Sequence, residues 1–136
     1  MAISDAPDGT MWVQVISVVV DTPIPPEPAN ETPAGGVARL ATASTSYQTI
    51  KTWTIAPGKV GELRFVEMDS TYYDKTRFKL VIGATTFFTD LELGGSLSLD
   101  FGALKLAAGS VVTLSAKSSD LTAIVAWGDI IGKEIG

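Results

Sequence analysis

Apolar and polar residues alternate along most of this sequence, most regularly in the stretch from Leu97 to Ile131. Three segments there, 97–101, 112–116 and 122–127, show the period of two that is typical of half-buried antiparallel strands. Small and polar residues separate these segments, as tight connections between strands require. The stretch therefore predicts three strands, each with one face on a core and the other toward water or a partner.

The same alternation predicts further strands at 47–55, 60–68, 77–83 and 84–93, the last being a strand or a bent loop. The segment from Ala56 to Lys59 has the composition of a tight turn, because Pro57 suits its second position and Gly58 accepts a positive φ. We therefore expect the strands at 47–55 and 60–68 to pair as a hairpin through this turn.

The alternation also predicts which side chains of these strands face the core. The inner-face residues are expected to be Trp53, Ile55, Leu63, Phe65, Phe78, Leu80 and Ile82. No segment shows a convincing helical period. About eight strands separated by such turns predict an all-β protein, built as a sandwich or a barrel of antiparallel strands.

The N-terminal part of the chain has a different character. Residues 11–20, MWVQVISVVV, are rich in β-branched residues and predict a strand, either internal to this chain's core or shared with an adjacent subunit. Residues 21–36 hold prolines at 23, 25, 26, 28 and 33, which exclude a helix or a central strand and favour an extended, polyproline-like segment.

We therefore divide the chain into an N-terminal strand and Pro-rich arm at 1–36 and a β-sandwich domain at 37–136. Two interpretations of the arm stay open. It lies across a neighbouring subunit, with Trp12, Pro25 and Pro26 as candidate contacts, or it forms a surface loop.

Composition narrows the class of protein. The chain has 136 residues, a length suited to one domain, and 46% of them are hydrophobic against 18% charged. We therefore expect part of the apolar surface to contact another subunit. The net charge is -5 and there is no cluster of basic residues, which makes nucleic acid an unsuitable partner.

The sequence contains no cysteine and no histidine. It therefore lacks disulfides, thiol nucleophiles, the Ser-His-Asp triad and the commonest zinc ligands, so we expect no enzymatic activity and no cofactor. The longest apolar run, 11–20, is far shorter than the roughly 20 residues that span a bilayer, and the first residues lack the pattern of a signal peptide. We expect neither a membrane segment nor a secretory signal.

Candidate binding residues occur in the polar segment at 69–76, where Tyr72 and Tyr73 lie near Asp69 and Asp74. Aromatic rings stack on the apolar faces of sugars, and carboxylates accept hydrogen bonds from sugar hydroxyls. This segment therefore has the composition of a carbohydrate site. The alternative is that one tyrosine caps the core and the other lies at a rim or a subunit contact.

Other chemistry-bearing residues are few. The carboxylate pairs are Glu62 with Glu67, Asp69 with Asp74, and Asp90 with Glu92. None of these pairs has the spacing of a known calcium loop, and a pair of carboxylates alone does not define a glycosidase. Trp12, Trp53 and Trp127 each fall on a predicted strand, where core or interface anchors are the expected roles.

Several segments of apolar alternation around Pro-Gly and Gly-Ser turns carry a resemblance to a known family. These segments are 53–58, 63–65, 78–83, 109–117 and 122–128. Through them, roughly residues 47–136 resemble the small jelly-roll modules of tailed-phage virions, such as head decoration (cement) proteins. The resemblance implies a jelly-roll sandwich, a homo-oligomer such as a trimer on a capsid lattice, and an N-terminal segment that reaches a neighbour. It carries over no individual functional residue.

Three functional hypotheses follow. The first is a non-enzymatic virion protein on the capsid surface, which binds the major capsid protein or other virion subunits and stabilises the head. The second is a carbohydrate- or receptor-binding module, and the third is a self-assembling filament subunit whose first strand completes a neighbour's sheet. The candidate interaction residues are Trp12, Pro25, Pro26, Tyr72, Tyr73 and Trp127.

Overall fold

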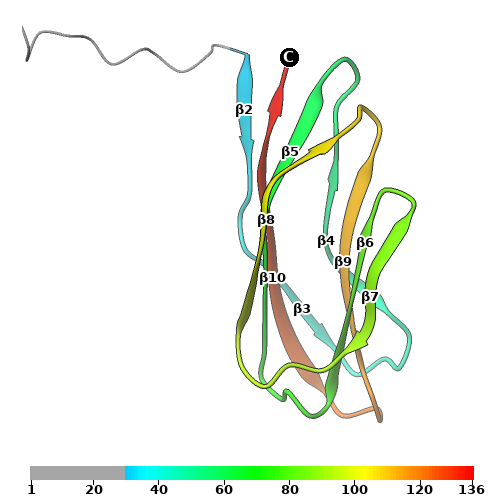
Figure 1. Cartoon of the computed structure of the whole chain (residues 1–136). Coiled ribbons are helices and arrows are strands. Elements are labelled where there is room, and N and C mark those ends of the chain that lie inside the picture. Colours follow the sequence, from blue (N-terminus) through cyan, green and yellow to red (C-terminus); the bar gives the residue numbers. More distant parts are fainter. Residues whose placement is uncertain (1–29) are drawn as a thin grey trace, which may run out of the picture.

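The structure, a computed structural model, describes residues 30–136 (Figure 1). Over this part of the chain it contains nine strands and no helix, which confirms the all-β prediction. The strands are β2 (Glu31–Ala34), β3 (Ala38–Thr42), β4 (Gln48–Thr54), β5 (Val60–Ser70), β6 (Thr76–Ile82), β7 (Thr85–Leu91), β8 (Leu97–Leu106), β9 (Val111–Ser118) and β10 (Ile124–Ile135).

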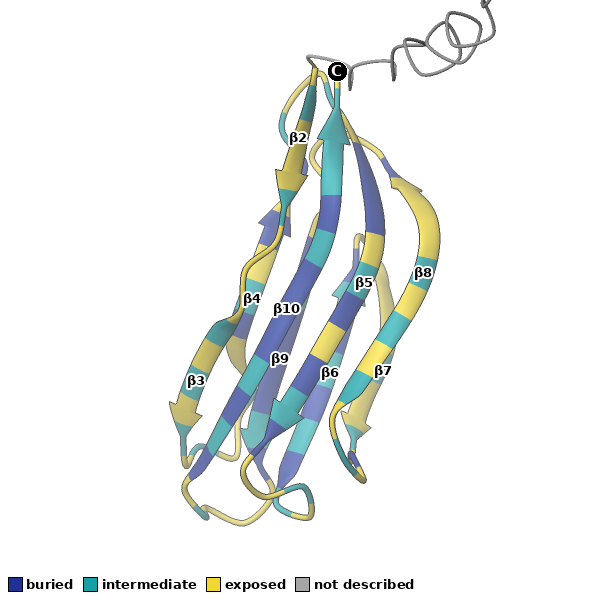
Figure 2. Ribbon diagram, turned by 90° about the vertical axis from the view of Figure 1, so that its left-hand side faces the viewer, coloured by how far each residue is buried: buried dark blue, intermediate teal, exposed yellow. Residues whose placement is uncertain are grey.

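These strands form two antiparallel sheets packed face to face (Figures 1 and 2). In one sheet the order is β2, β10, β5, β8, and β3 also pairs with β10. In the other sheet the order is β4, β9, β6, β7. Figure 2 shows β7 and β8 together at one side of the molecule and β3 and β4 at the other. The prediction of a sandwich of antiparallel strands is confirmed.

The core lies between the sheets and is built from the inward positions of the alternating strands. Ile55, Leu63, Phe78, Leu80 and Leu114 are fully buried there. Trp53 and Ile82 are also buried, so six of the seven predicted inner-face residues are confirmed. Burial of apolar surface on this scale, at about 25 cal/mol per Å², is the main force that holds the two sheets together.

Phe65 is the exception, because it is only half-buried and lies outside the core cluster. The pairing of β5 with β8 shifts register between Leu63 and Phe65. Such a β-bulge places an extra residue in one strand and moves the following side chains to the opposite face. Val66 and Met68 therefore face the core in place of Phe65, and the prediction for Phe65 was wrong.

The predicted hairpin between the strands at 47–55 and 60–68, which are β4 and β5 in the structure, is also wrong. The turn at 56–59 forms, but it connects β4 in one sheet to β5 in the other. The end of β4 is instead held by the segment before β9, since the Ile55 amide donates to the Ser110 carbonyl at 2.9 Å and the Gly109 amide donates to the Ile55 carbonyl at 2.9 Å. The turn is therefore a corner between the two sheets.

The last part of the Pro-rich segment pairs within this chain. β2 is an edge strand along β10, and Pro33 lies opposite Lys133, at an edge where a missing amide donor is tolerated. β3 continues along the same side of β10, after an interruption at Gly35 to Val37. The predicted strand at 11–20 and the candidate residues Trp12, Pro25 and Pro26 lie outside the described residues.

Candidate functional site

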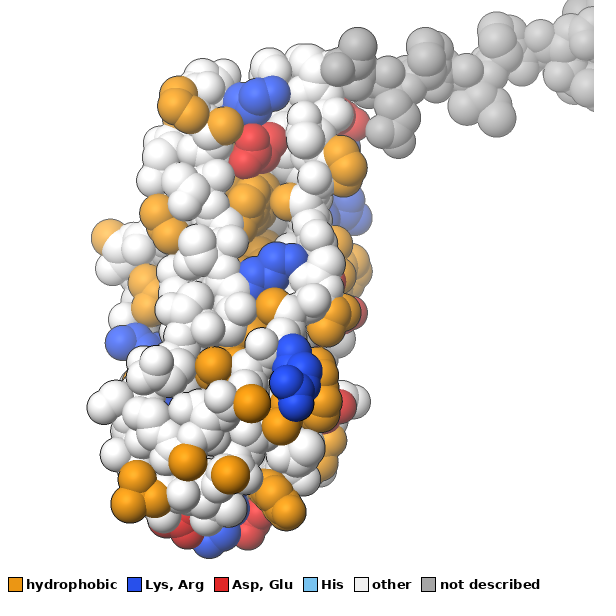
Figure 3. Space-filling view, turned by 180° about the vertical axis from the view of Figure 1, so that it is seen from behind, with side chains coloured by type: hydrophobic (Ala, Val, Ile, Leu, Met, Phe, Trp, Pro, Cys, Tyr) orange, Lys and Arg blue, Asp and Glu red, His pale blue; other side chains and the backbone are white. Residues whose placement is uncertain are grey.

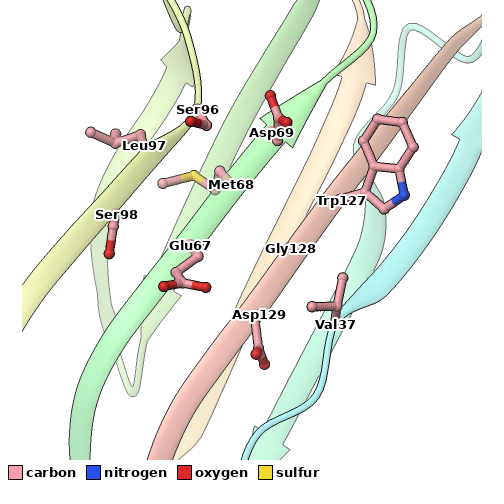
Figure 4. A pocket seen from close by; sticks show the side chains of 10 residues that line it. All are labelled: Val37, Glu67, Met68, Asp69, Ser96, Leu97, Ser98, Trp127, Gly128 and Asp129. Carbon is pink, nitrogen blue, oxygen red and sulfur yellow. The ribbon is translucent and has the colours of Figure 1, made fainter.

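A hollow with a volume of about 390 Å³ opens on the outer face of the sheet that contains β10, β5 and β8 (Figure 4). This volume is within the range of small-molecule sites, roughly 300–1,000 Å³. The lining residues are Val37, Glu67, Met68, Asp69, Ser96, Leu97, Ser98, Trp127, Gly128 and Asp129.

Strand register places the polar and aromatic residues of the hollow in two adjacent rows. In one row Trp127 of β10 lies opposite Asp69 of β5. In the next row Glu67 of β5 lies opposite both Asp129 of β10 and Ser98 of β8. Paired residues share a face of the sheet, and so do residues two apart along a strand. The backbone pairing therefore fixes the layout of the site.

The aromatic ring and the carboxylates take different sides of the hollow. In Figure 4 the half-buried Trp127 ring turns a broad face outward. The carboxylates of Glu67, Asp69 and Asp129 lie on the remaining sides. The hollow thus combines an apolar platform with hydrogen-bond acceptors around it.

Asp129 is held by groups from outside its own strand. Its Oδ1 accepts a hydrogen bond from the Gly36 amide at 2.9 Å, and it lies 3.1 Å from Nζ of Lys51. Lys51 also donates to the Gly36 carbonyl, so one ammonium contacts both groups. These contacts leave Asp129 only 6% exposed although it lies on the outer face of the sheet.

Asp69 is positioned by the loop that follows β5. Its Oδ1 accepts hydrogen bonds from the Tyr73 hydroxyl and from the Ser70 amide, the latter at 2.9 Å. The hydrogen bond to Asp69 raises the pKa of the Tyr73 phenol. Tyr73 packs against the core, whereas Tyr72 is 52% exposed and does not line the hollow. Tyr73 is thus bonded to the residue that lies opposite Trp127 in the strand register, whereas Tyr72 is not part of the hollow.

A second polar cluster lies on the outer face of the other sheet, beside a hollow of about 350 Å³. The Tyr47 hydroxyl donates to Asp90 Oδ1 at 2.6 Å and accepts from the Asp90 amide at 2.7 Å. Lys117 Nζ lies 3.2 Å from Asp90 Oδ1 and 4.7 Å from the centre of the Tyr47 ring. The hydrogen bond from Tyr47, followed by that from Lys117, lowers the pKa of Asp90. These groups satisfy one another and form a structural cluster.

Glu62 and Glu92, each from a different carboxylate pair of the sequence, contact basic side chains. Glu62 pairs with Lys105, and the hydrogen bond from Lys105 lowers the pKa of Glu62. Glu92 lies 3.6 Å from Arg77. Within residues 30–136, no three acidic side chains are placed so that they could hold a metal ion.

An apolar side, which we define as Phe87, Phe88, Phe101 and Leu104 of β7 and β8, spans the edges of both sheets. The rings of Phe87 and Phe101 meet edge to face with their centres 5.1 Å apart. Phe87 is 54% exposed and Leu104 is 40% exposed. The opposite side differs, since Lys and Arg side chains lie along its length with hydrophobic side chains between them (Figure 3).

The fold and these sites define a two-sheet, all-β protein with an aromatic and acidic hollow on one outer face. No family model and no curated protein matches this chain. The stretch that the structure covers has no helix long and apolar enough to cross a membrane.

Proposed function

We propose that the protein is a non-enzymatic structural protein of a virion, located on the capsid surface. In this proposal it forms a homo-oligomer, binds the major capsid protein or other virion subunits, and stabilises the head through contacts between subunits. The observation that carries the proposal is the exposed apolar side of β7 and β8.

The strand pairing supports a jelly-roll topology for this protein. β3 pairs with β10, β4 with β9, β5 with β8, and β6 with β7. These nested pairs correspond to one long antiparallel hairpin that is wrapped into two sheets. Jelly rolls occur in viral capsid proteins and in lectins, so the topology is compatible with both the first and the second hypothesis.

The apolar side supports a contact with another subunit. Within residues 30–136, β7 and β8 each pair with a neighbour on one side only, so in this part of the chain each has a row of backbone groups without a strand partner. Proteins usually protect such edges with lysine, proline or a covering segment, and an exposed apolar cluster beside an open edge marks an interaction surface. Phe87 and Leu104 are exposed at these edges, where a second copy of the chain is the occupant we propose.

Light scattering on the full chain over a concentration series tests this contact. We expect a trimer, and we expect the Phe87→Ser/Leu104→Ser variant to dissociate it. The matched control is Leu121→Ser, because Leu121 is 70% exposed but lies in the loop before β10. A wild-type monomer at every concentration overturns the proposed contact. A mass that keeps increasing with concentration overturns the trimer and supports the filament hypothesis.

The virion assignment has a separate test. Virions are purified by density gradient from a culture in which this protein is produced. An antiserum raised against the purified protein is expected to label the outside of these intact virions. Complete absence of the protein from those particles, judged by mass spectrometry, overturns the assignment.

The hollow beside Trp127 favours the carbohydrate-binding hypothesis as a second candidate function.

A further inference from the structure

We propose that the hollow beside Trp127 is a binding site for an uncharged hexopyranose, such as the terminal sugar of a neutral glycan. The ring would stack on Trp127, and its hydroxyls would donate to Asp69, Asp129 and Glu67. This proposal does not depend on whether the protein is part of a virion.

Two carboxylates of the hollow, those of Asp69 and Asp129, each accept their hydrogen bonds from the protein through one oxygen. Asp129 accepts both of its protein hydrogen bonds through Oδ1, and Asp69 does the same. In the described part of the chain no protein donor reaches Oδ2 of either residue. Asp129 lines the hollow, so its remaining acceptor capacity is available to a ligand there. A ligand hydroxyl would donate to it.

Trp127 supplies the second requirement of a sugar site. Its ring is half-buried, which holds it in place, and its broad face is turned outward at the rim of the hollow (Figure 4). The apolar face of a pyranose packs on such a ring while its hydroxyls point sideways. Ser96 and Ser98 line the far side of the hollow, where they can both donate to and accept from a hydroxyl.

The same geometry argues against other ligands. The carboxylates are too far apart for a metal ion, since within residues 30–136 no three of them are placed to hold one. Their negative charge repels sialic and uronic acids. A lysine or arginine side chain could contact the carboxylates and the Trp127 ring. It has no acceptor, however, for the hydroxyl groups of Ser96 and Ser98 to donate to.

Titration calorimetry and saturation-transfer NMR of the full chain test the proposal. The probes are the methyl β-glycosides of glucose, galactose, mannose and N-acetylglucosamine, with N-acetylneuraminic acid as the charged comparison. We expect at least one neutral glycoside to bind and the acid not to bind. Trp127→Ala is expected to weaken binding at least tenfold, and the isosteric Asp69→Asn is expected to weaken it several-fold.

Tyr72→Ala is the matched control, because Tyr72 is an exposed aromatic residue of the neighbouring loop that does not line the hollow. It is expected to leave binding unchanged, and urea unfolding confirms that each variant is folded. The proposal is overturned if none of the neutral glycosides binds the wild type, or if folded Trp127→Ala binds as well as wild type. Binding of Nα-acetyl-lysine amide in calorimetry, with no binding of any glycoside, would overturn the proposal and identify a cation site instead.

Discussion

Lys51 of β4 and Asp129 of β10 form an ion pair of 3.1 Å that joins the two sheets at the side where β3 and β4 lie. The Lys51 side chain is 21% exposed and that of Asp129 is 9% exposed. The Gly36 amide donates to the same carboxylate, at the interruption between β2 and β3. One pair thus fixes the contact between the sheets, the path of the edge strand and one side of the hollow.

Lys51→Met is expected to destabilise the protein by about 1–3 kcal/mol, because it leaves the buried Asp129 carboxylate without its cation. Asp129→Asn is expected to cost less, since the amide oxygen still accepts from Gly36. Urea unfolding of both single variants and of the double variant measures the coupling, and the double variant should lose less than the sum.

Lys75→Met is the matched control for this ion pair. Lys75 pairs with Asp120 at 2.6 Å, but the two side chains are 38% and 44% exposed, so solvent screens the pair and the expected loss of stability is much smaller. Equal losses for Lys51→Met and Lys75→Met would contradict the structural role of the Lys51–Asp129 pair.

Gly128→Ala is expected to destabilise the protein by about 1–3 kcal/mol through overpacking. A Cβ at this position would lie 2.4 Å from Cδ2 of the fully buried Leu114 and 3.2 Å from Cγ2 of Ile50. Gly94→Ala is the control, because a Cβ there has no atom within 4 Å. Thermal and urea unfolding of the two variants should separate them clearly, and a neutral Gly128→Ala would show that β10 does not pack this closely on β9.

The salt bridge at Asp120 predicts a specific acid response. The hydrogen bond from Lys75, followed by that from Thr122, lowers the pKa of Asp120 from 3.8 to about 2. A carboxyl whose pKa is lower in the folded state stabilises that state above its unfolded pKa and loses this contribution as the pH falls through its folded pKa. The contribution of Asp120 should therefore be complete above about pH 4 and lost by about pH 2.

The Asp120→Asn variant isolates this contribution, since its side-chain oxygen still accepts the Thr122 amide that bonds to Asp120 Oδ1 at 3.2 Å. Urea unfolding at pH 2, 3, 4 and 5 should show wild type and variant converging as the pH falls from 4 to 2. A constant difference in the free energy of unfolding across that window would disagree with the lowered pKa.

Tyr47→Phe is expected to destabilise the protein by about 1–2 kcal/mol, because it removes a hydroxyl that both donates to and accepts from Asp90. Asp90 has a positive φ of 53°, so these bonds hold an unfavourable backbone conformation near the end of β7. Hydrogen exchange should show faster exchange of the Asp90 amide in the variant. An unchanged exchange rate would mean that the hydroxyl does not hold this turn.

The candidate site was predictable only in part. Alternation along β10 places Trp127 and Asp129 on the same face, and that much is readable from the sequence. Alternation along β5 from Leu63 and Phe65 would turn Glu67 and Asp69 inward, and only the bulge turns them outward. The sequence also drew attention to Trp127 and to Tyr73 beside Asp69. It did not show that β5 pairs with β10, and this pairing of residues about 60 positions apart brings the carboxylates to Trp127. Tyr72 was selected on composition alone, and composition does not report which face of a loop a ring takes.

The sequence by itself determined the class of fold, the positions of most strands and most of the core, because alternation and turn residues act between near neighbours. Phe78, Leu80 and Ile82 are buried for that reason. Only the tertiary structure decided which sheet each strand joins, since the turn at 56–59 is compatible with a hairpin or with a corner between sheets. It also decided the bulge that turns Val66 inward in place of Phe65, because a register shift depends on the partner strand and leaves no local signal.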